Sequence, residues 1–329
     1  MASSLAAPGR FTLGIDIGGT NTCFGIVSPE GEIILRGSLP TCGHYDFQAF
    51  ADALHKEVTD SLHAAGLSAS DLGALGVGAP CVDFRSGEIV GAVDLPWPSP
   101  TPLAAVMQAT FGLPAHAEND ANAAALGELA FGAARGLSDV LVITLGTGVG
   151  SAIICDGRLL HGYRGLAGEL GHTIAERDSD RLCSCGRMGC LETYASARGV
   201  VCTAASMLAL SAEESSLRRL TQMTAGDVGR AADNGDPIAL RAFAETGKVL
   251  GRACAEFAAF CSPQAVIFFG GVARSFHHFE GAMRREYEKN LLWIYRENEV
   301  RFLPSTLPEA DAAILGAAAV ASSPSDFSI

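Results

Sequence analysis

The sequence predicts a two-domain α/β protein. Its 329 residues are enough for two domains that each have a core. Two segments resemble each other, because each has an apolar strand, a glycine-rich turn and a second apolar strand that ends at a hairpin signal: residues 15–27 (IDIGGTNTCFGIV) and 143–155 (ITLGTGVGSAIIC). Strand and helix patterns also alternate along the chain, which indicates α/β layers. We interpret the repeat as a duplication of one α/β unit.

The elements of the first half follow from local patterns. The first hairpin closes at residues 28–31, and apolar residues at helical spacing then predict an amphipathic helix over residues 46–65. A buried strand is expected over residues 72–80. Another strand, over residues 115–118, leads into a helix over residues 121–131.

The second half begins with the other hairpin, which closes at Asp156-Gly157. Beyond residue 192 the pattern is helical, and its longest helix is expected over residues 238–260. A strand over residues 265–269 and a final helix over residues 311–321 follow. We expect residues 1–120 to form a small N-terminal α/β domain and residues 121–307 a large one, with the C-terminal helix, about residues 308–329, packing back onto the first domain.

Composition excludes several classes of protein. Hydrophobic residues make up 48% and charged residues 18%, as in ordinary globular proteins. The net charge of −13 argues against nucleic acid as a partner, since binding it requires basic patches. No run of eighteen apolar residues is present and the first ten residues lack the features of a signal peptide, so no membrane segment is expected. Most of the ten cysteines stand singly in apolar runs, for example Cys23, Cys155 and Cys261, which is typical of reduced thiols in a cytoplasmic protein.

Both glycine-rich turns are candidate phosphate-binding loops. Glycines let the backbone approach a phosphate closely and direct several N–H groups at its oxygens. One such turn is weak evidence, but two copies are stronger. Neither is a P-loop or a dinucleotide fingerprint, because no Gly-Lys-Ser/Thr follows and each turn leads into a strand. The candidate residues are Gly18, Gly19, Thr20, Asn21, Gly146, Thr147 and Gly148.

Two further features accompany these loops. Asp16 ends a strand of apolar neighbours, where a buried carboxylate is costly unless it meets a cation or a donor. It could help to orient Mg²⁺ bound to ATP phosphates, or it could simply cap the turn. Gly270 and Gly271 follow a third buried strand and would allow the backbone to approach an adenine or a ribose, although that signal is poor alone.

A cluster of soft ligands predicts a zinc site. His172, Cys183, Cys185 and Cys190 lie within one short segment and provide three thiolates and an imidazole, the ligand set of a closed tetrahedral zinc site. Glycines at 186 and 189 allow the chain to turn between the cysteines. No ligand position is left for an activated water, so structural Zn²⁺ is expected. The alternative is a group of buried or redox thiols.

Residues 118–122 (ENDAN) stand where a strand meets a helix. Asn119 or Asp120 could merely cap the helix. A carboxylate near two phosphate loops is also well placed to take a proton from an alcohol, which makes Asp120 a candidate general base.

Together these motifs resemble those of the ROK family of sugar kinases, named for repressors, open reading frames and kinases. The resemblance runs from Gly14 to about Ala319 and rests on DIGGTN, ENDANAAA, LGTGVG and GELGH joined to CxCGxxGCLE. It implies a two-domain actin-like ATPase (ribonuclease H-like) fold with a cleft between the domains. It also implies a homodimer.

The resemblance implies roles for individual residues. Asp120 would be the general base. Asn119, Glu169, His172 and Glu192 would hold sugar hydroxyls, and His172 would ligate zinc through its other ring nitrogen. The implied reaction is transfer of the γ-phosphate of ATP, with Mg²⁺, to the 6-hydroxyl of a hexose, with glucose as the expected substrate.

One position departs from the family pattern. Relatives usually have Asn-Leu in a second sugar-facing segment, whereas this chain has Asp94-Leu95. A carboxylate only accepts hydrogen bonds, while an amide also donates. The preferred hexose therefore stays open among glucose, mannose, fructose, allose, N-acetylglucosamine and N-acetylmannosamine, and Asp94 could also lie on a solvated loop.

Two other classes of protein are alternatives. A sugar-responsive ROK repressor would carry a helix-turn-helix before the first phosphate strand, and about ten residues precede that strand here. An actin-like or chaperone-type ATPase would not need the sugar-binding glutamates or the zinc motif.

Overall fold

The computed structural model describes residues 10–92, 94–297 and 299–322. The chain divides into two compact units. Unit 1 consists of Met1–Arg135 and Thr306–Ile329, and unit 2 of Gly136–Ser305.

The sheet of unit 1, within the described residues, has five strands in the order β3-β2-β1-β4-β7. The first three strands pair antiparallel, while β1, β4 and β7 run parallel. A short antiparallel pair, β5 and β6, follows β4. The strands are β1 (Phe11–Ile17), β2 (Asn21–Val27), β3 (Ile33–Pro40), β4 (Leu72–Ala79), β5 (Val82–Asp83), β6 (Glu88–Ile89) and β7 (Ala115–Asn119).

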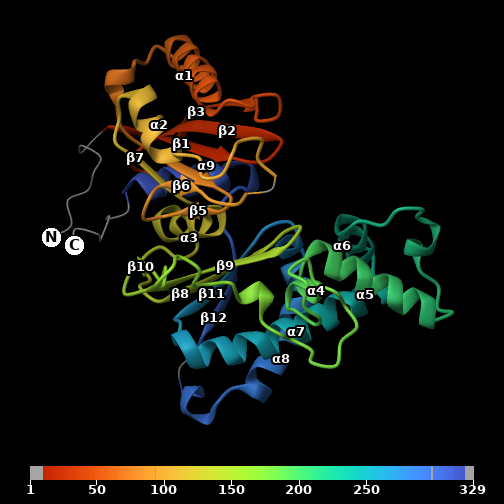
Figure 1. Ribbon diagram of the computed structural model, residues 1–329. Helices are drawn as coiled ribbons and strands as arrows, with labels where there is room; N and C mark the ends of the chain where they lie inside the picture. The colour runs from red at the N-terminus through yellow and green to blue at the C-terminus, as the bar shows by residue number, and fades with distance from the viewer. Residues whose placement is uncertain (1–9, 93, 298, 323–329) are drawn as a thin grey trace. The chain divides into compact units, whose positions relative to one another are not determined.

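Helices cover both faces of this sheet (Figure 1). α1 and α2 lie on one face and α3 and α9 on the other. α1 begins where the Asp46 side chain accepts a hydrogen bond from the Ala49 N–H at 2.8 Å, and its buried residues fill the core with those of the sheet. The predicted helix over residues 46–65 is therefore confirmed. The helices are α1 (Phe47–Ala64), the 3₁₀ turn η1 (Ala69–Asp71), α2 (Leu103–Phe111), α3 (Asp120–Phe131) and α9 (Glu309–Ser322).

Two glycines allow α9 to lie directly on the sheet. A Cβ on Gly14 of β1 would stand 2.3 Å from the carbonyl oxygen of Ile314, and one on Gly76 of β4 would stand 1.9 Å from that of Ala317. α9 also packs along α3. Because of this packing α3 belongs to unit 1, and the expected division near residue 120 is corrected to one after Arg135.

The sheet of unit 2 repeats the plan of unit 1. In the described chain its strands take the order β10-β9-β8-β11-β12, with β8, β9 and β10 antiparallel and β8, β11 and β12 parallel. Asp156 and Gly157 both have positive φ, 51° and 73°, which suits the tight turn between β9 and β10. The equal strand order and directions support the duplication inferred from the repeated hairpins. The strands are β8 (Val140–Leu145), β9 (Val149–Cys155), β10 (Arg158–Leu159), β11 (Ala265–Phe269) and β12 (Arg301–Pro304).

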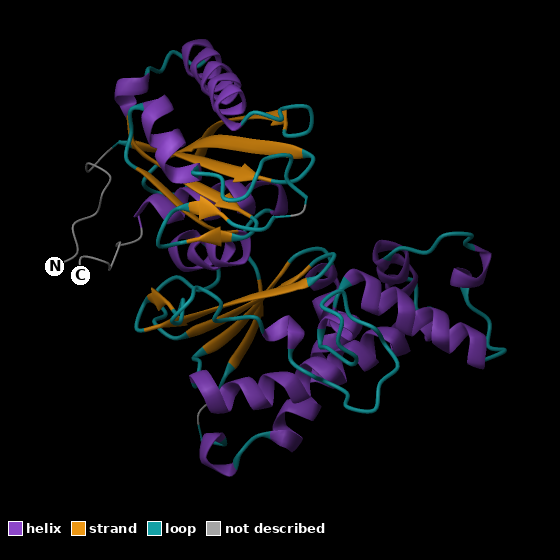
Figure 2. Cartoon of the chain, viewed as in Figure 1, coloured by secondary structure: helices purple, strands orange, loops and turns teal. Residues whose placement is uncertain are grey.

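The long helix α7 is the centre of the helical part of unit 2. It begins at the Asp236 cap and packs closely along α8, since a Cβ on Gly247 would stand 2.4 Å from the carbonyl oxygen of Phe279. Between β10 and α4 the chain is largely loop (Figure 2). The helices are η2 (Leu170–His172), α4 (Glu192–Ala195), α5 (Ala197–Leu210), η3 (Ser216–Arg219), α6 (Ala225–Asp233), α7 (Pro237–Cys261), η4 (Val272–Ser275), α8 (Phe276–Asn290) and η5 (Trp293–Tyr295).

Two expectations from composition can be compared with the structure. Among the residues that the structure describes, no helix has both the length and the apolar character needed to cross a membrane. All ten cysteines lie in the described part of the chain and are free thiols.

Candidate active site

The glycine turn of unit 1 is held from both sides. The Gly18 N–H donates to the Asn21 carbonyl at 3.1 Å, and the Thr20 carbonyl accepts from the Thr41 N–H at 2.9 Å. A Cβ on Gly19 would stand 2.8 Å from the Asp94 carbonyl oxygen. Glycine is therefore required where the turn meets the segment around Asp94, and the structure brings these two predicted site segments together.

Asp16 is the penultimate residue of β1 and lies beside this turn. Its partner across the parallel β1–β4 pair is Gly78, where an added Cβ would stand 3.6 Å from the Asp16 Oδ1. Burial raises the pKa of Asp16 to about 6, and the nearby Asp120 carboxylate adds to the effect. A carboxylate that is costly to ionise in this way gains free energy from a cation, so the arrangement fits the proposed role toward magnesium.

Asp120 is the first residue of α3. Its Oδ1 accepts a hydrogen bond from the Ala121 N–H at 2.7 Å, and the Asn119 Oδ1 accepts from the same N–H at 3.0 Å. Asn119 is thus the helix cap, as one of the two interpretations expected. Although part of Asp120 faces solvent, burial of its carboxyl group raises its pKa, which the hydrogen bond from Ala121 partly offsets.

Glu118 was not predicted as a site residue. It is only 5% exposed, and its Oε1 accepts hydrogen bonds from the Asn119 N–H at 2.9 Å and from the Asn122 Nδ2 at 3.0 Å. The side chain therefore fixes the turn that presents Asn119 and Asp120. The i, i+4 spacing of Glu118 and Asn122 was the available signal.

In unit 2, Glu192 connects the second glycine turn to the cysteine segment. Its Oε2 accepts from the Val149 N–H at 3.1 Å, and a Cβ on Gly148 would stand 2.6 Å from this oxygen. Its Oε1 accepts from the Ser184 hydroxyl at 2.9 Å and from the Cys183 thiol at 3.5 Å. Glu192 is a predicted sugar-binding residue, and both of its carboxylate oxygens are thus held by hydrogen-bond donors of the protein.

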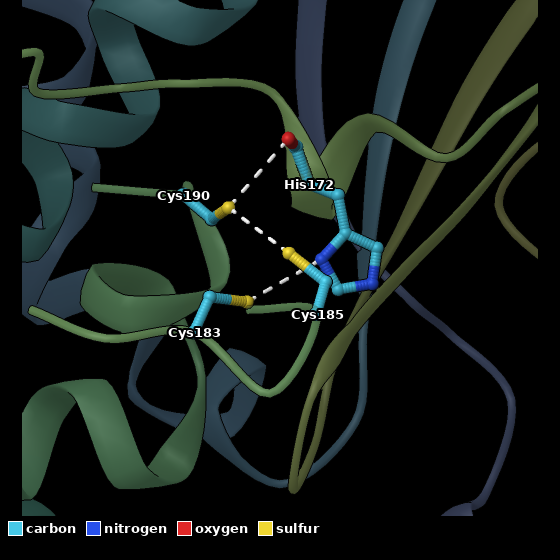
Figure 3. Close-up of side chains that lie close together, drawn as sticks. All are labelled: His172, Cys183, Cys185 and Cys190. Carbon is cyan, nitrogen blue, oxygen red and sulfur yellow. Dashed lines mark hydrogen bonds between the residues drawn. The ribbon is translucent and has the colours of Figure 1, made fainter. Parts of the chain in front are cut away.

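The four predicted zinc ligands converge (Figure 3). Their candidate ligand atoms all lie within 4.8 Å of one another. The Cys183 Sγ is 3.5 Å from the His172 Nδ1, and the Cys185 and Cys190 Sγ atoms are 3.6 Å apart. Tetrahedral zinc with ordinary bond lengths separates sulfur from nitrogen by about 3.6 Å and two sulfurs by about 3.8 Å. The residues therefore fit zinc, and the Nδ1 of His172 is the nitrogen that faces the thiols.

Arg187 favours the thiolate form of one cysteine in this cluster. A hydrogen bond from Arg187 lowers the pKa of Cys185 to about 6, while burial raises that of Cys190 to about 12. Arg187 also donates to the His172 carbonyl at 2.7 Å. A thiolate at Cys185 is the form that binds metal.

The other predicted residues of unit 2 lie at turns. Glu169 is exposed and immediately precedes η2, where the Leu170 N–H donates to the Ser151 Oγ at 3.1 Å. Gly270 has φ of 100°, and an added Cβ would stand 2.8 Å from the Leu145 carbonyl oxygen. Gly270 and the second glycine turn are therefore neighbours.

The structure thus holds two sets of predicted residues, one in each unit. The set of unit 1 comprises Asp16, Gly18, Gly19, Thr20, Asn21, Asp94, Asn119 and Asp120. The set of unit 2 comprises Gly146, Thr147, Gly148, Glu169, His172, Cys183, Cys185, Cys190, Glu192, Gly270 and Gly271.

Comparison with known proteins identifies the same family that the sequence motifs resemble. A family model described as "ROK family" matches residues 12–323. A glucokinase from Halalkalibacterium halodurans is 37% identical over 279 residues, which cover 81% of this chain and 82% of the relative. A xylose repressor from Caldicellulosiruptor bescii is 30% identical over 78% of this chain and 66% of its own length. The crystal structure of a ROK family glucokinase from Streptomyces griseus, in complex with glucose and AMPPNP, has a TM-score of 0.75 and 33% identity, and the match covers 94% of this chain and 98% of that one.

Proposed function

Because this chain belongs to the ROK family, we propose that it is an ATP-dependent hexose kinase that transfers the γ-phosphate of ATP to the 6-hydroxyl of glucose. The observation that carries the proposal is the pair of Asp16 and Asp120, whose carboxyl groups both have raised pKa values beside the glycine turn of unit 1. The glucokinase relative and the glucose and AMPPNP complex support sugar and ATP as substrates.

The chemistry assigns one task to each carboxylate. As the sugar oxygen attacks the γ-phosphorus, Asp120 accepts the hydroxyl proton, the new O–P bond forms and the bond to the β-phosphate oxygen breaks, which releases ADP. Because burial raises the pKa of Asp120, its carboxylate is a better base than that of an ordinary surface aspartate. Asp16 would help to orient the Mg²⁺ that accompanies ATP, and this ion would offset phosphate charge.

We assign the sugar hydroxyls to Asn119, Glu169, His172 and Glu192, with Asp94 in a second sugar-facing segment. Structural zinc bound by His172 Nδ1 and the three cysteines would fix the tautomer of the ring and leave Nε2 for the sugar. The Nδ1 to Cys183 distance of 3.5 Å supports this division of the two nitrogens.

The decisive experiment measures ADP release with Mg-ATP and a panel of the six hexoses, for the wild type and for Asp120→Asn. The variant should bind glucose and ATP within a few-fold of the wild type while turnover falls by roughly 10²–10⁴-fold. Asp52→Asn, an exposed aspartate to asparagine change on α1, is the matched control and should keep full activity. Near-normal turnover of Asp120→Asn would remove the proposed base.

Two alternatives have specific support. A kinase for another hexose is favoured by the carboxylate at Asp94, and the same panel would identify it. A sugar-sensing regulator is favoured by the xylose repressor relative, and sugar binding without turnover on the whole panel would point to it. We also propose a cytoplasmic homodimer, which sedimentation and cell fractionation would test.

A further inference from the structure

A second group of metal-ligating side chains lies in unit 2, apart from the residues of the proposed reaction. Asp233 is the last residue of α6, and His277 and His278 stand in the first turn of α8. One ligand atom from each of the three residues lies within 4.8 Å of the others.

Both histidines address the same carboxylate oxygen. The His278 Nε2 is 2.8 Å and the His277 Nε2 3.3 Å from the Asp233 Oδ1. A tetrahedral ion with metal–ligand bonds of about 2.1 Å holds neighbouring nitrogen and oxygen ligands about 3.4 Å apart. The His277 distance is close to this separation, and the His278 distance is shorter.

The site combines a fixed ligand with accessible ones. The His278 side chain is 11% exposed and its ring stacks on that of Phe243 from α7, with centroids 5.7 Å apart. The His277 and Asp233 side chains are 63% and 57% exposed. Hydrogen bonds at such exposed positions compete with water and contribute little to stability. They therefore account poorly for the placement of two histidines at one carboxylate.

The charges near Asp233 include a paired arginine. Arg230, in the last turn of α6, forms an ion pair with Asp227. The carboxyl end of α6, where Asp233 lies, carries the negative end of the helix dipole.

We propose that Asp233, His277 and His278 form a binding site for a divalent transition-metal ion, with Zn²⁺ as the expected occupant. Two imidazoles and one carboxylate suit Zn²⁺, whereas Mg²⁺ prefers oxygen ligands throughout. Solvent completes the coordination shell. The bound ion ties the end of α6 to the start of α8.

Zinc stoichiometry by equilibrium dialysis tests this proposal independently of the cysteine site, because the full-length proteins compared all keep that site. The wild type should bind one more Zn²⁺ per chain at micromolar zinc than His277→Gln/His278→Gln. Asp233→Asn should weaken this extra binding at least about tenfold. His63→Gln, an exposed histidine of α1, should match the wild type.

A second measurement covers the case in which a variant is destabilised. Zinc should raise the Tm of the wild type more than that of Asp233→Asn, whose altered side chain is exposed and compatible with folding. Excess Mg²⁺ should not displace the extra zinc. Equal zinc content in the wild type and the double variant, or extra binding only at millimolar zinc, would overturn the proposal.

Discussion

Replacing Asp16 by asparagine should stabilise unit 1 while it abolishes the proposed reaction. Burial raises the pKa of this carboxyl from 3.8 to about 6. A shift of about 2 units corresponds to about 3 kcal/mol that the ionised group costs the folded state at pH 8. Asparagine has the same shape without the charge, but burying its amide also costs free energy. We therefore expect Asp16→Asn to increase the free energy of unfolding by about 1–3 kcal/mol.

The pH dependence of the stability tests whether the charge of Asp16 causes this destabilisation. A folded-state pKa above the unfolded value means that the folded protein binds the proton more tightly, so Asp16 costs most stability above about pH 6. The cost falls as the pH drops through 6 and is gone below about pH 4. The difference between wild type and Asp16→Asn should follow this course, and it should be smaller in an Asp120→Asn background because Asp120 contributes to the shift.

The two tryptophans make unit 1 observable by itself. Trp97 is 7% exposed in unit 1, and Trp293 is 76% exposed in unit 2. Urea unfolding followed by fluorescence in a Trp293→Phe background therefore reports on the surroundings of Trp97. With Trp293→Phe in both proteins, equal free energies of unfolding for wild-type Asp16 and Asp16→Asn at pH 8 would refute the argument. A difference in the free energy of unfolding that does not change between pH 8 and pH 4 would also refute it.

Three further perturbations test other parts of the structure. Cys185→Ser should lower zinc content and raise the KM for the sugar more than the KM for ATP, because the ring of His172 is then no longer held by the metal. An unchanged zinc content in elemental analysis would contradict the assigned ligands. Asp94→Asn should change relative kcat/KM among hexoses on the sugar panel, whereas an equal loss for every sugar would indicate a structural role. Gly76→Ala should destabilise unit 1 by about 1–3 kcal/mol or more in urea, because its Cβ would meet the Ala317 carbonyl oxygen at 1.9 Å, while Gly226→Ala, with no atom nearer than 3.5 Å, should be close to neutral.

Local patterns predicted the elements well where burial has a clear period. α1, β4, β7, β11 and α7 all lie within two residues of their expected bounds. The edge strand β3 was not predicted, because its exposure alternates but its sequence does not: Ile34 is apolar on the exposed face, and Arg36, Gly37 and Ser38 interrupt the apolar residues. The division near residue 120 failed for a different reason, since α3 is placed by contact with α9 from the far end of the chain.

The sequence predicted the residues of the candidate site but not the contacts between them. Motif spacing indicated the cysteine cluster, and the distances between its ligand atoms agree with it. The contacts of Glu192 with both Val149 and Ser184, and that of Asp94 with Gly19, depend on how distant loops pack. Such contacts have no local period and require the folded structure.

The return of α9 to the first sheet constrains the order of events during synthesis. Unit 2, Gly136–Ser305, leaves the ribosome before α9 does, and at about 5–20 residues per second this takes on the order of ten seconds or more. Throughout that interval the sheet face around Gly14 and Gly76 lacks its covering helix. Unit 2 can therefore complete its core on the nascent chain first, while unit 1, although it begins the sequence, finishes last.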